Sequence, residues 1–400
     1  MKYKAGDQLT PRKKLIMKIY FITLAAIIAA AFISCGEPEK EHSHDHEVPT
    51  VGIPLLGGGS HSIGAVSMKI IATESDGLNM PRDLEFHPIN PDQLWIASRD
   101  SSMVILGDTG GTHQTSRKVQ SIFDNGLHFF AEPSAISFGD DGNFASVHET
   151  DKETQGLSSQ GGTPSDFMGP TLWTSDLSIY NAGHSSHIDM MHNSPLGMGI
   201  AWEKDNVYWI FDGFHSSITR YDFGEGHGAG GTFHDDGVVS RYIEGEVKRS
   251  PDVVSHLEFD SASKLLYIAD TGNSRIAVLD TRVGTRGDDL PNFYDCYRHE
   301  GADRTCSDYH RIKEASIQTF VDGNEHGISK PSGLALHNEI LYVSSYTTGT
   351  IYGFSLDGTL VDWLDLKRPR SLGGLEFDSL GNLYVVDTGA NEVIKIGLRK

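Results

Sequence analysis

Histidine is the residue type that most clearly could do chemistry in this chain, which contains 19 of them. His187-Ile188-Asp189 followed by His192 places two imidazoles and a carboxylate within six residues. Imidazole nitrogen is the commonest side-chain ligand for transition metals such as Zn, Cu, Fe and Ni. Further candidates of the same type are His148, His215, His256 and His326. These residues predict a site for a divalent transition metal, with zinc preferred, provided that the fold brings them together.

The three cysteines indicate an exported protein rather than a cysteine-based zinc site. Cys296 and Cys306 flank a polar segment, and in an oxidising compartment such a pair is expected to form a disulfide that closes a short loop. A zinc site built from cysteine needs more than two such ligands. Cys35 is set apart from this pair because it follows an apolar segment and a single small residue, Ser34.

Other motifs carry less chemistry. Asp270 and Asp387 each precede Thr-Gly, where a carboxylate most simply holds a turn through local hydrogen bonds. The glycine-rich run over 224–231 lacks the Lys-Ser/Thr ending of a phosphate-binding loop. No Gly-x-Ser-x-Gly element is present, so the usual serine-hydrolase elbow is not supported.

A repeat supplies the elements that must position the histidines. Each copy contains an apolar strand, a tight turn and a second strand that leads into a third. The clearest copies begin at His256, Pro331 and Gly373, and weaker ones begin at Pro81, Pro133 and Leu196. Repeats of this length with several strands each predict a propeller. Because the last copy ends after its third strand at 393–396, residues 67–72 are expected to pair there and close the ring.

The copies resemble NHL repeats, most clearly in "LLYIADTGNSRIAVLD" from Leu265 and "NLYVVDTGANEVIKI" from Asn382. The resemblance covers residues 67–397. It implies an all-β fold, a six-bladed β-propeller closed by an N-terminal strand. This fold hosts binders, scaffolds and enzymes, so the resemblance is specific for fold and poor for function.

The strand order of a blade sorts the histidines by rim. The first strand runs down and the second up, so the connectors into blades and the loops after second strands share one rim, which we call the upper rim. The residues predicted there are His148, His187, His192, His215, His256 and His326, with Asp189 beside them. His227 and His234 lie in a glycine-rich insertion expected on the opposite rim. We therefore predict a metal at the upper mouth of the channel; the alternative is that these residues only hydrogen-bond loops together.

Residues 1–34 have the layout of a secretory signal, with basic residues before an apolar run over 19–33. That run is short for a membrane span. Its end resembles the bacterial lipoprotein box, which implies that Cys35 becomes the acylated N-terminus; an uncleaved membrane anchor is the alternative. Gly36 resembles the residue that follows the cysteine in outer-membrane lipoproteins of Gram-negative bacteria. Met17 is an alternative start.

Residues 35–66 are expected to form a disordered, His- and Glu-rich tether, which leaves 67–400 for the propeller. The histidine tract over 42–47 is either a scavenger of metal ions or a solvated linker. The net charge of −21 disfavours nucleic acid, because an acidic surface repels phosphates. The expected partners are the membrane, through the lipid, and an unidentified small-molecule or protein ligand.

Two functions are compatible with these features. The favoured one is a ligand-binding or scaffolding propeller at the cell envelope with a metal at its mouth. The alternative is a metal-dependent lyase or hydrolase that uses the same histidines. The chain distantly resembles the peptidyl-hydroxyglycine lyase, an NHL-type propeller with a His-ligated metal, but His215 and His256 are offset in register from its motifs. A sugar-lactone hydrolase of related shape would need acidic ligands on the inner strands, which fits the histidines less well.

Overall fold

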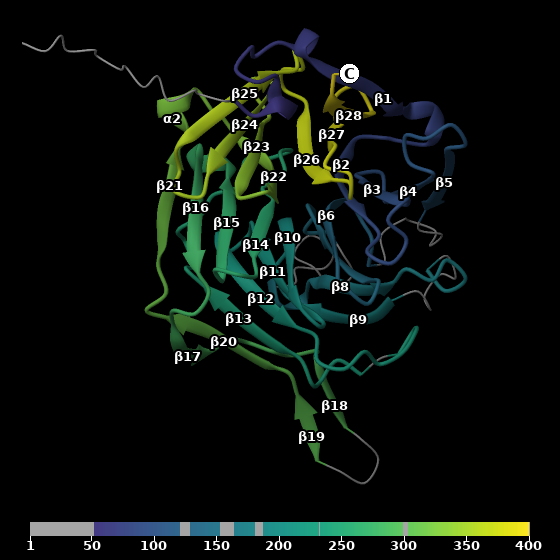
Figure 1. The fold of residues 1–400 in the computed structure, drawn as a ribbon. Coiled ribbons are helices and arrows are strands. Elements are labelled where there is room, and N and C mark those ends of the chain that lie inside the picture. Colours follow the sequence, from purple (N-terminus) through teal and green to yellow (C-terminus); the bar gives the residue numbers. More distant parts are fainter. Residues whose placement is uncertain are drawn as a thin grey trace, which may run out of the picture. The chain divides into compact units, whose positions relative to one another are not determined.

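The computed structural model describes residues 52–120, 129–152, 164–180, 187–231, 233–298 and 303–399. Their strands form six sheets and one small hairpin (Figure 1). The innermost strand of each sheet lies beside the innermost strands of the sheets on either side, which closes a ring. The predicted all-β, six-bladed propeller is therefore confirmed.

Each blade is a sheet whose strands follow one another from the innermost to the outermost. Blade 1 contains β2 (Pro81–Phe86), β3 (Leu94–Ser98), β4 (Ser102–Gly107) and β5 (Thr115–Gln120). Blade 2 contains β6 (Pro133–Phe138), β7 (Asn143–His148), β8 (Met168–Thr174) and β9 (His187–His192). Blade 3 contains β10 (Gly197–Lys204), β11 (Val207–Asp212), β12 (Ser217–Asp222) and β13 (Val238–Tyr242).

The remaining three blades follow the same order. Blade 4 contains β14 (Leu257–Asp260), β15 (Leu265–Asp270), β16 (Arg275–Asp280) and β21 (Ile317–Asp322). Blade 5 contains β22 (Pro331–His337), β23 (Ile340–Ser345), β24 (Thr350–Ser355) and β25 (Leu360–Asp365). Blade 6 contains β26 (Leu372–Phe377), β27 (Leu383–Asp387), β28 (Glu392–Leu398) and β1 (Val66–Ala72).

The strands are apolar on both faces because each blade is packed between two others. In β15, Leu266, Tyr267 and Ile268 are all almost completely buried, although successive side chains of a strand point to opposite faces. Leu266 and Ile268 belong to a cluster with Trp209 of blade 3, while Tyr267 belongs to a cluster with Val343 of blade 5. Burial of each such side chain stabilises the fold by about 1.5–3 kcal/mol.

The ring closes with a strand from the N-terminal side, as predicted. β1 pairs antiparallel with β28, which places Met68 opposite Ile396 and Ile70 opposite Ile394. Figure 1 shows the purple β1 beside the yellow β28. This pairing covers the edge of β28 that would otherwise expose unpaired backbone groups.

The expectation of a disordered tether as far as residue 66 is wrong at its C-terminal end. The 3-10 helix η1 (Pro54–Leu56) buries Leu55 and Leu56 against the closing blades, and η2 (Ile63–Ala65) leads directly into β1. Removing the side chains of Leu55 and Leu56 from water lowers the free energy of the folded state, and this holds the segment against the propeller. The signal segment, Cys35 and the histidine tract lie outside the described residues.

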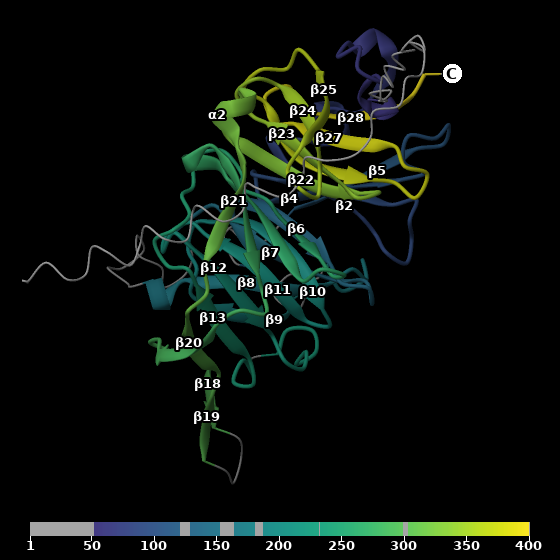
Figure 2. The same cartoon turned by 60° about the vertical axis from the view of Figure 1, so that its left-hand side comes forward.

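A long excursion interrupts blade 4 between β16 and β21. It contains β17 (Thr285–Asp289), β18 (Cys296–Arg298), β19 (Arg304–Cys306) and β20 (Asp308–Lys313). β20 pairs in parallel with β13, so the excursion extends the sheet of blade 3 to six strands. β18 and β19 form a hairpin that projects from the blades in both views (Figure 2). The predicted disulfide between Cys296 and Cys306 joins these two strands and is confirmed.

Candidate metal centre

The structure divides the predicted histidine set between two rims. His187 opens β9 and His192 ends it, so they lie at opposite ends of the outermost strand of blade 2. In the strand register, Met168 faces His192 and Trp173 faces His187. The predicted position of His187 in a connector on the upper rim is therefore wrong, because the segment over 187–192 is the fourth strand of the blade.

His187 instead meets two histidines of the insertion between β12 and β13. One ring nitrogen each of His187, His227 and His234 lies within 4.8 Å of the others. The ring centroids of His187 and His227 are 5.3 Å apart, and those of His227 and His234 are 4.8 Å apart. Among the described residues, this is the one group of three or more His, Cys, Asp or Glu side chains close enough to share a metal ion. We refer to these three residues as the histidine cluster.

Backbone hydrogen bonds fix the insertion against the edge of β9. The backbone N–H of His227 donates to the carbonyl oxygen of Ile188 at 3.0 Å, and that of Gly230 donates to the carbonyl oxygen of His187 at 2.9 Å. These bonds satisfy backbone groups of an outermost strand that would otherwise have no partner on that side. They also place His227 beside His187 without requiring any ion.

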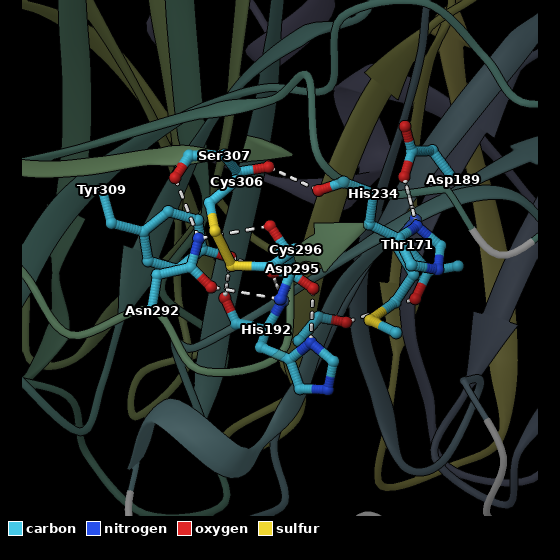
Figure 3. Close-up of polar contacts among 12 residues, drawn as sticks. Thr171, Asp189, His192, His234, Asn292, Asp295, Cys296, Cys306, Ser307 and Tyr309 are labelled. Carbon is cyan, nitrogen blue, oxygen red and sulfur yellow. Dashed lines mark hydrogen bonds and ion pairs between the residues drawn. A yellow bond between two sulfur atoms is a disulfide. The ribbon is translucent and has the colours of Figure 1, made fainter. Parts of the chain in front are cut away.

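The hydrogen bonds of the cluster indicate which ring nitrogens carry protons. Nδ1 of His227 lies 2.7 Å from the carbonyl oxygen of Gly228, so it donates and leaves Nε2 with a free lone pair. This Nε2 is buried and has no hydrogen-bond partner among the described residues. Nδ1 of His234 lies 2.8 Å from Oδ1 of Asp189 and 3.4 Å from the backbone nitrogen of Met190 (Figure 3). The contact with the carboxylate is much shorter, so we assign the ring proton to Nδ1, which leaves the lone pair of His234 on Nε2.

Burial affects the protonation states of the residues in and beside the histidine cluster. Removal from water lowers the pKa of His227 and so favours its neutral form, which is the form that binds metals. Burial also raises the pKa of Asp189 to about 6, and its hydrogen bond with His234 opposes that rise. Oδ2 of Asp189 is buried without a hydrogen-bond partner in the described part of the chain. An anionic carboxylate and an unpaired nitrogen together favour a bound cation.

The donor set fits a transition metal. Three imidazole ligands leave one position of a tetrahedral zinc site for a further ligand. Asp189 accepts from the ring N–H of His234, and metal-binding histidines commonly hold such a contact with a carboxylate, which fixes the ring and raises its basicity. His187, His227 and His234 are therefore the residues that would hold the ion, and Asp189 would orient one of them.

His192, at the other end of β9, is fixed by the excursion. Its Nδ1 lies 2.6 Å from Oδ1 of Asp295, and its backbone N–H donates to Oδ2 of the same carboxylate at 2.8 Å (Figure 3). Its ring stacks on Tyr294, and the hydroxyl of Tyr309 donates to Asp295 as well. Asp295 is fully buried next to the disulfide. These contacts make His192 a link between blade 2 and the excursion.

The other predicted ligands do not converge. Burial lowers the pKa of His148 to about 3 and that of His256 to about 4. His148 contacts Ser146, His256 lies 3.5 Å from a carboxylate oxygen of Asp83, and His215 is held by Asp212 at 2.8 Å. His326 ends the short helix α2 (Gly323–His326) and contacts Phe354. None of these four belongs to a multi-ligand group among the described residues.

Sequence reasoning placed His227 and His234 in the correct insertion but gave them no role. The local pattern at 187–192 resembles a metal-binding motif. The histidines that actually lie beside His187 come 40 or more residues later in the chain. The missing signal was the strand character of the stretch "HIDMMH". Taken as the fourth strand of blade 2, it runs upward and begins at the lower rim, where the insertion after β12 also lies.

Comparisons with known proteins support the fold. No protein-family model matches the chain, and a search of curated proteins found no match. An auxiliary nutrient binding protein from Bacteroides ovatus is similar at 13% identity and a TM-score of 0.51, over 84% of this chain and 77% of its own. A structural-genomics protein of unknown function from Bacteroides thetaiotaomicron is similar at 10% identity and a TM-score of 0.53, over 84% and 76%. Identities this low show a shared fold and carry no residue roles.

The described residues contain no helix that is both long and apolar enough to cross a bilayer.

Proposed function

We propose that this protein is a lipid-anchored propeller of the cell envelope that binds a divalent transition metal through His187, His227 and His234. The observation that carries the proposal is the convergence of three imidazole nitrogens within 4.8 Å, with the Nε2 of His227 buried and unpaired. An unpaired buried acceptor costs about 1–3 kcal/mol, so a ligand that uses it stabilises the folded state.

Zinc is the expected ion. Imidazole ligands suit Zn, Cu, Fe and Ni, and three of them with one further ligand make up the tetrahedral arrangement that zinc prefers. The cluster is closed to solvent on most sides: His187 is 5% exposed, and the side chain of His227 is 2% exposed. This burial favours a retained ion that fastens the insertion onto β9 over a catalytic ion that must receive a substrate.

Residues of the N-terminal segment support the envelope location. A basic start, an apolar run and Ser34 before Cys35 are the features of an exported lipoprotein. The disulfide between Cys296 and Cys306 agrees with an oxidising compartment. The Bacteroides ovatus protein of similar fold is named as a nutrient binding protein, and we propose a binding role for this chain as well.

Metal analysis of the purified full-length protein tests the proposal. The histidines at 42, 44 and 46 are first replaced by Ser, so that the tether cannot contribute bound ion. We expect about one equivalent of zinc in this background and its loss on His227→Ala, while the matched exposed variant His113→Ala keeps it. Equal zinc content in the His227→Ala and His113→Ala proteins would contradict the proposal.

A further inference from the structure

A cavity separate from the histidine cluster lies at the upper rim between blades 2 and 3. Its volume is about 320 Å³, which is at the small end of the range for ligand pockets. Polar side chains that follow β9, β11 and β13 form one part of its wall, and apolar side chains of the excursion form another. Two of the lining residues lie on β13 and β20, which Figure 1 shows side by side with β17. None of the lining residues belongs to the histidine cluster.

A buried arginine forms the polar wall. Arg241 is 4% exposed, and its Nη2 donates to Oδ1 of Asn193 at 2.9 Å. Its Nε–H is buried and has no acceptor among the described residues. A buried guanidinium with an unused donor is costly unless an acceptor is supplied, so this wall favours an anionic ligand.

A second arginine stands at the mouth of the cavity. Arg311 is exposed over 41% of its side chain, and its Nε donates to Oε2 of Glu244 at 2.9 Å. The same carboxylate lies 3.7 Å from Nη1 of Arg241. Among the charged lining residues, one carboxylate therefore faces two guanidinium groups. The buried carboxylate of Asp212 also acts on Arg241, so the charges around the cavity balance, and the unused Nε–H of Arg241 is what favours an anionic ligand.

His215 supplies a third polar group. Its Nδ1 lies 2.8 Å from Oδ2 of the fully buried Asp212, and its backbone N–H also donates to that carboxylate at 3.0 Å. This contact fixes the ring and leaves Nε2 as the nitrogen that can meet a ligand. The sequence predicts a metal ligand at His215, whereas its surroundings are those of an oriented hydrogen-bonding group.

The excursion supplies an apolar wall. Leu290 is buried, while Phe293 remains 61% exposed at the rim of the cavity. The segment between them is held in place, because Nδ2 of Asn292 donates to the carbonyl oxygen of Ser307 at 2.9 Å. An exposed aromatic ring on a fixed segment is suited to cover an apolar ligand.

We propose that this cavity binds a small organic carboxylate with an apolar, ring-sized body. The carboxylate meets Arg241 and Arg311, and the body lies against Leu290 and Phe293. Inorganic phosphate satisfies the arginines but not the apolar wall, and a neutral aromatic alcohol satisfies only the wall. The site therefore discriminates by requiring both features together.

Benzoate is the probe, and its binding to the full-length protein is measured by isothermal titration and ligand-observed NMR. Arg311→Ala is expected to weaken binding by about tenfold, because it removes a charge-assisted hydrogen bond. Arg286→Ala is the matched control, since Arg286 is an exposed, ion-paired arginine of the same excursion outside the cavity. Benzyl alcohol and inorganic phosphate are expected to bind at least tenfold more weakly than benzoate.

Three results would overturn the proposal. They are the absence of benzoate binding, equal binding by the Arg311→Ala and Arg286→Ala proteins, and binding of phosphate as tight as that of benzoate. Because Arg311 is exposed, its replacement leaves the fold intact; Phe293→Ser, also at an exposed position, provides an independent second variant that should weaken benzoate binding.

Discussion

His192 and His227 both have buried side chains but differ in the state of their ring nitrogens. His192 is tied to Asp295 through both its ring and its backbone and is stacked on Tyr294, so its contacts are those of a structural residue. His227 has one nitrogen occupied by a backbone carbonyl and the other buried and unpaired. Burial alone therefore does not mark a ligand, and our proposal for His227 rests on its unpaired nitrogen beside two other imidazoles.

Asp189→Asn tests the role of the carboxylate. An amide cannot supply the negative charge that orients His234 and raises its basicity, so we expect zinc affinity to fall by about 10–100-fold. Competition with a chromophoric chelator measures the change. Asp140→Asn, at an exposed turn of the same blade, serves as the control and should bind zinc as the wild type does. An unchanged affinity in Asp189→Asn would show that the carboxylate plays no part in the site.

The pKa of Asp189 also predicts a pH dependence for metal binding. Burial raises this pKa to about 6, so the carboxylate gains a proton as the pH falls through that value. Protons also compete for the imidazoles in the same range. Zinc should therefore be retained at pH 7.5 and released progressively below pH 6.

Acidic residues on the innermost strands of blades 1, 4 and 6 predict that the stability of the fold depends on pH. Burial and the charge of Asp83 raise the pKa of Glu376 to about 7, and burial together with neighbouring carboxylates raises the pKa of Glu85 and Glu258 well above the usual range. A folded-state pKa above the unfolded value means that the folded protein holds a proton that the unfolded chain releases. The stability from this group is complete below about pH 4.5 and is lost as the pH rises through about 7.

Glu376→Gln should remove this loss, because glutamine keeps the size of the side chain and cannot ionise. We expect the thermal midpoint at pH 8 to rise by about 2–4 °C relative to the wild type and to change little at pH 5. Thermal unfolding followed by circular dichroism measures both. Glu225→Gln, at an exposed position, should match the wild type at each pH. A Glu376→Gln protein with the pH profile of the wild type would contradict the assignment.

At the scale of elements, the excursion from blade 4 departs most from the regular blade pattern. It also supports two other blades, blade 2 and blade 3. β20 extends blade 3, and Asp295 fastens the end of β9 in blade 2. The disulfide holds the hairpin of β18 and β19 beside this carboxylate. One insertion thereby fixes the outer strands of blades 2 and 3 and carries one wall of the cavity near Arg241.

Asp295→Ala should weaken this attachment. It leaves the backbone N–H and the ring of His192 without their acceptor in a buried place, so we expect the free energy of unfolding to fall by about 2–3 kcal/mol. Chemical denaturation of the purified protein provides the measurement. Asp303→Ala, an exposed aspartate directly before β19 of the same excursion, is the control. Equal stability of the two variants would show that the contact is dispensable.

The sequence predicted the strands well and the sites poorly, for a physical reason. Runs such as the one over 265–270 carry local β character and turn residues at fixed spacing, which suffices to locate blades and even the closing strand β1. The pairing of β20 with β13 joins positions 70 residues apart, and no local pattern encodes it. The histidine cluster depends on a similar long-range contact, so the residue type was predicted while the partners of His187 were not.

At the scale of the whole molecule, we propose that a lipid on Cys35 holds the protein at the membrane. Cys35→Ser should abolish acylation and move the protein from the membrane fraction to the soluble fraction. Metabolic labelling with palmitate and fractionation measure the two effects. Replacement of Cys296 and Cys306 by Ser should leave both unchanged, because these residues form the disulfide. Continued membrane association of Cys35→Ser would favour the uncleaved anchor instead.

X-ray absorption at the zinc edge gives the most direct test of the central claim. The sample is full-length protein whose tether histidines have been replaced, loaded with one equivalent of zinc. The proposed site predicts three imidazole nitrogens at about 2.0–2.1 Å from the metal, with one of them lost in His227→Ala. A spectrum that shows only oxygen ligands, or one that His227→Ala leaves unchanged, would contradict it.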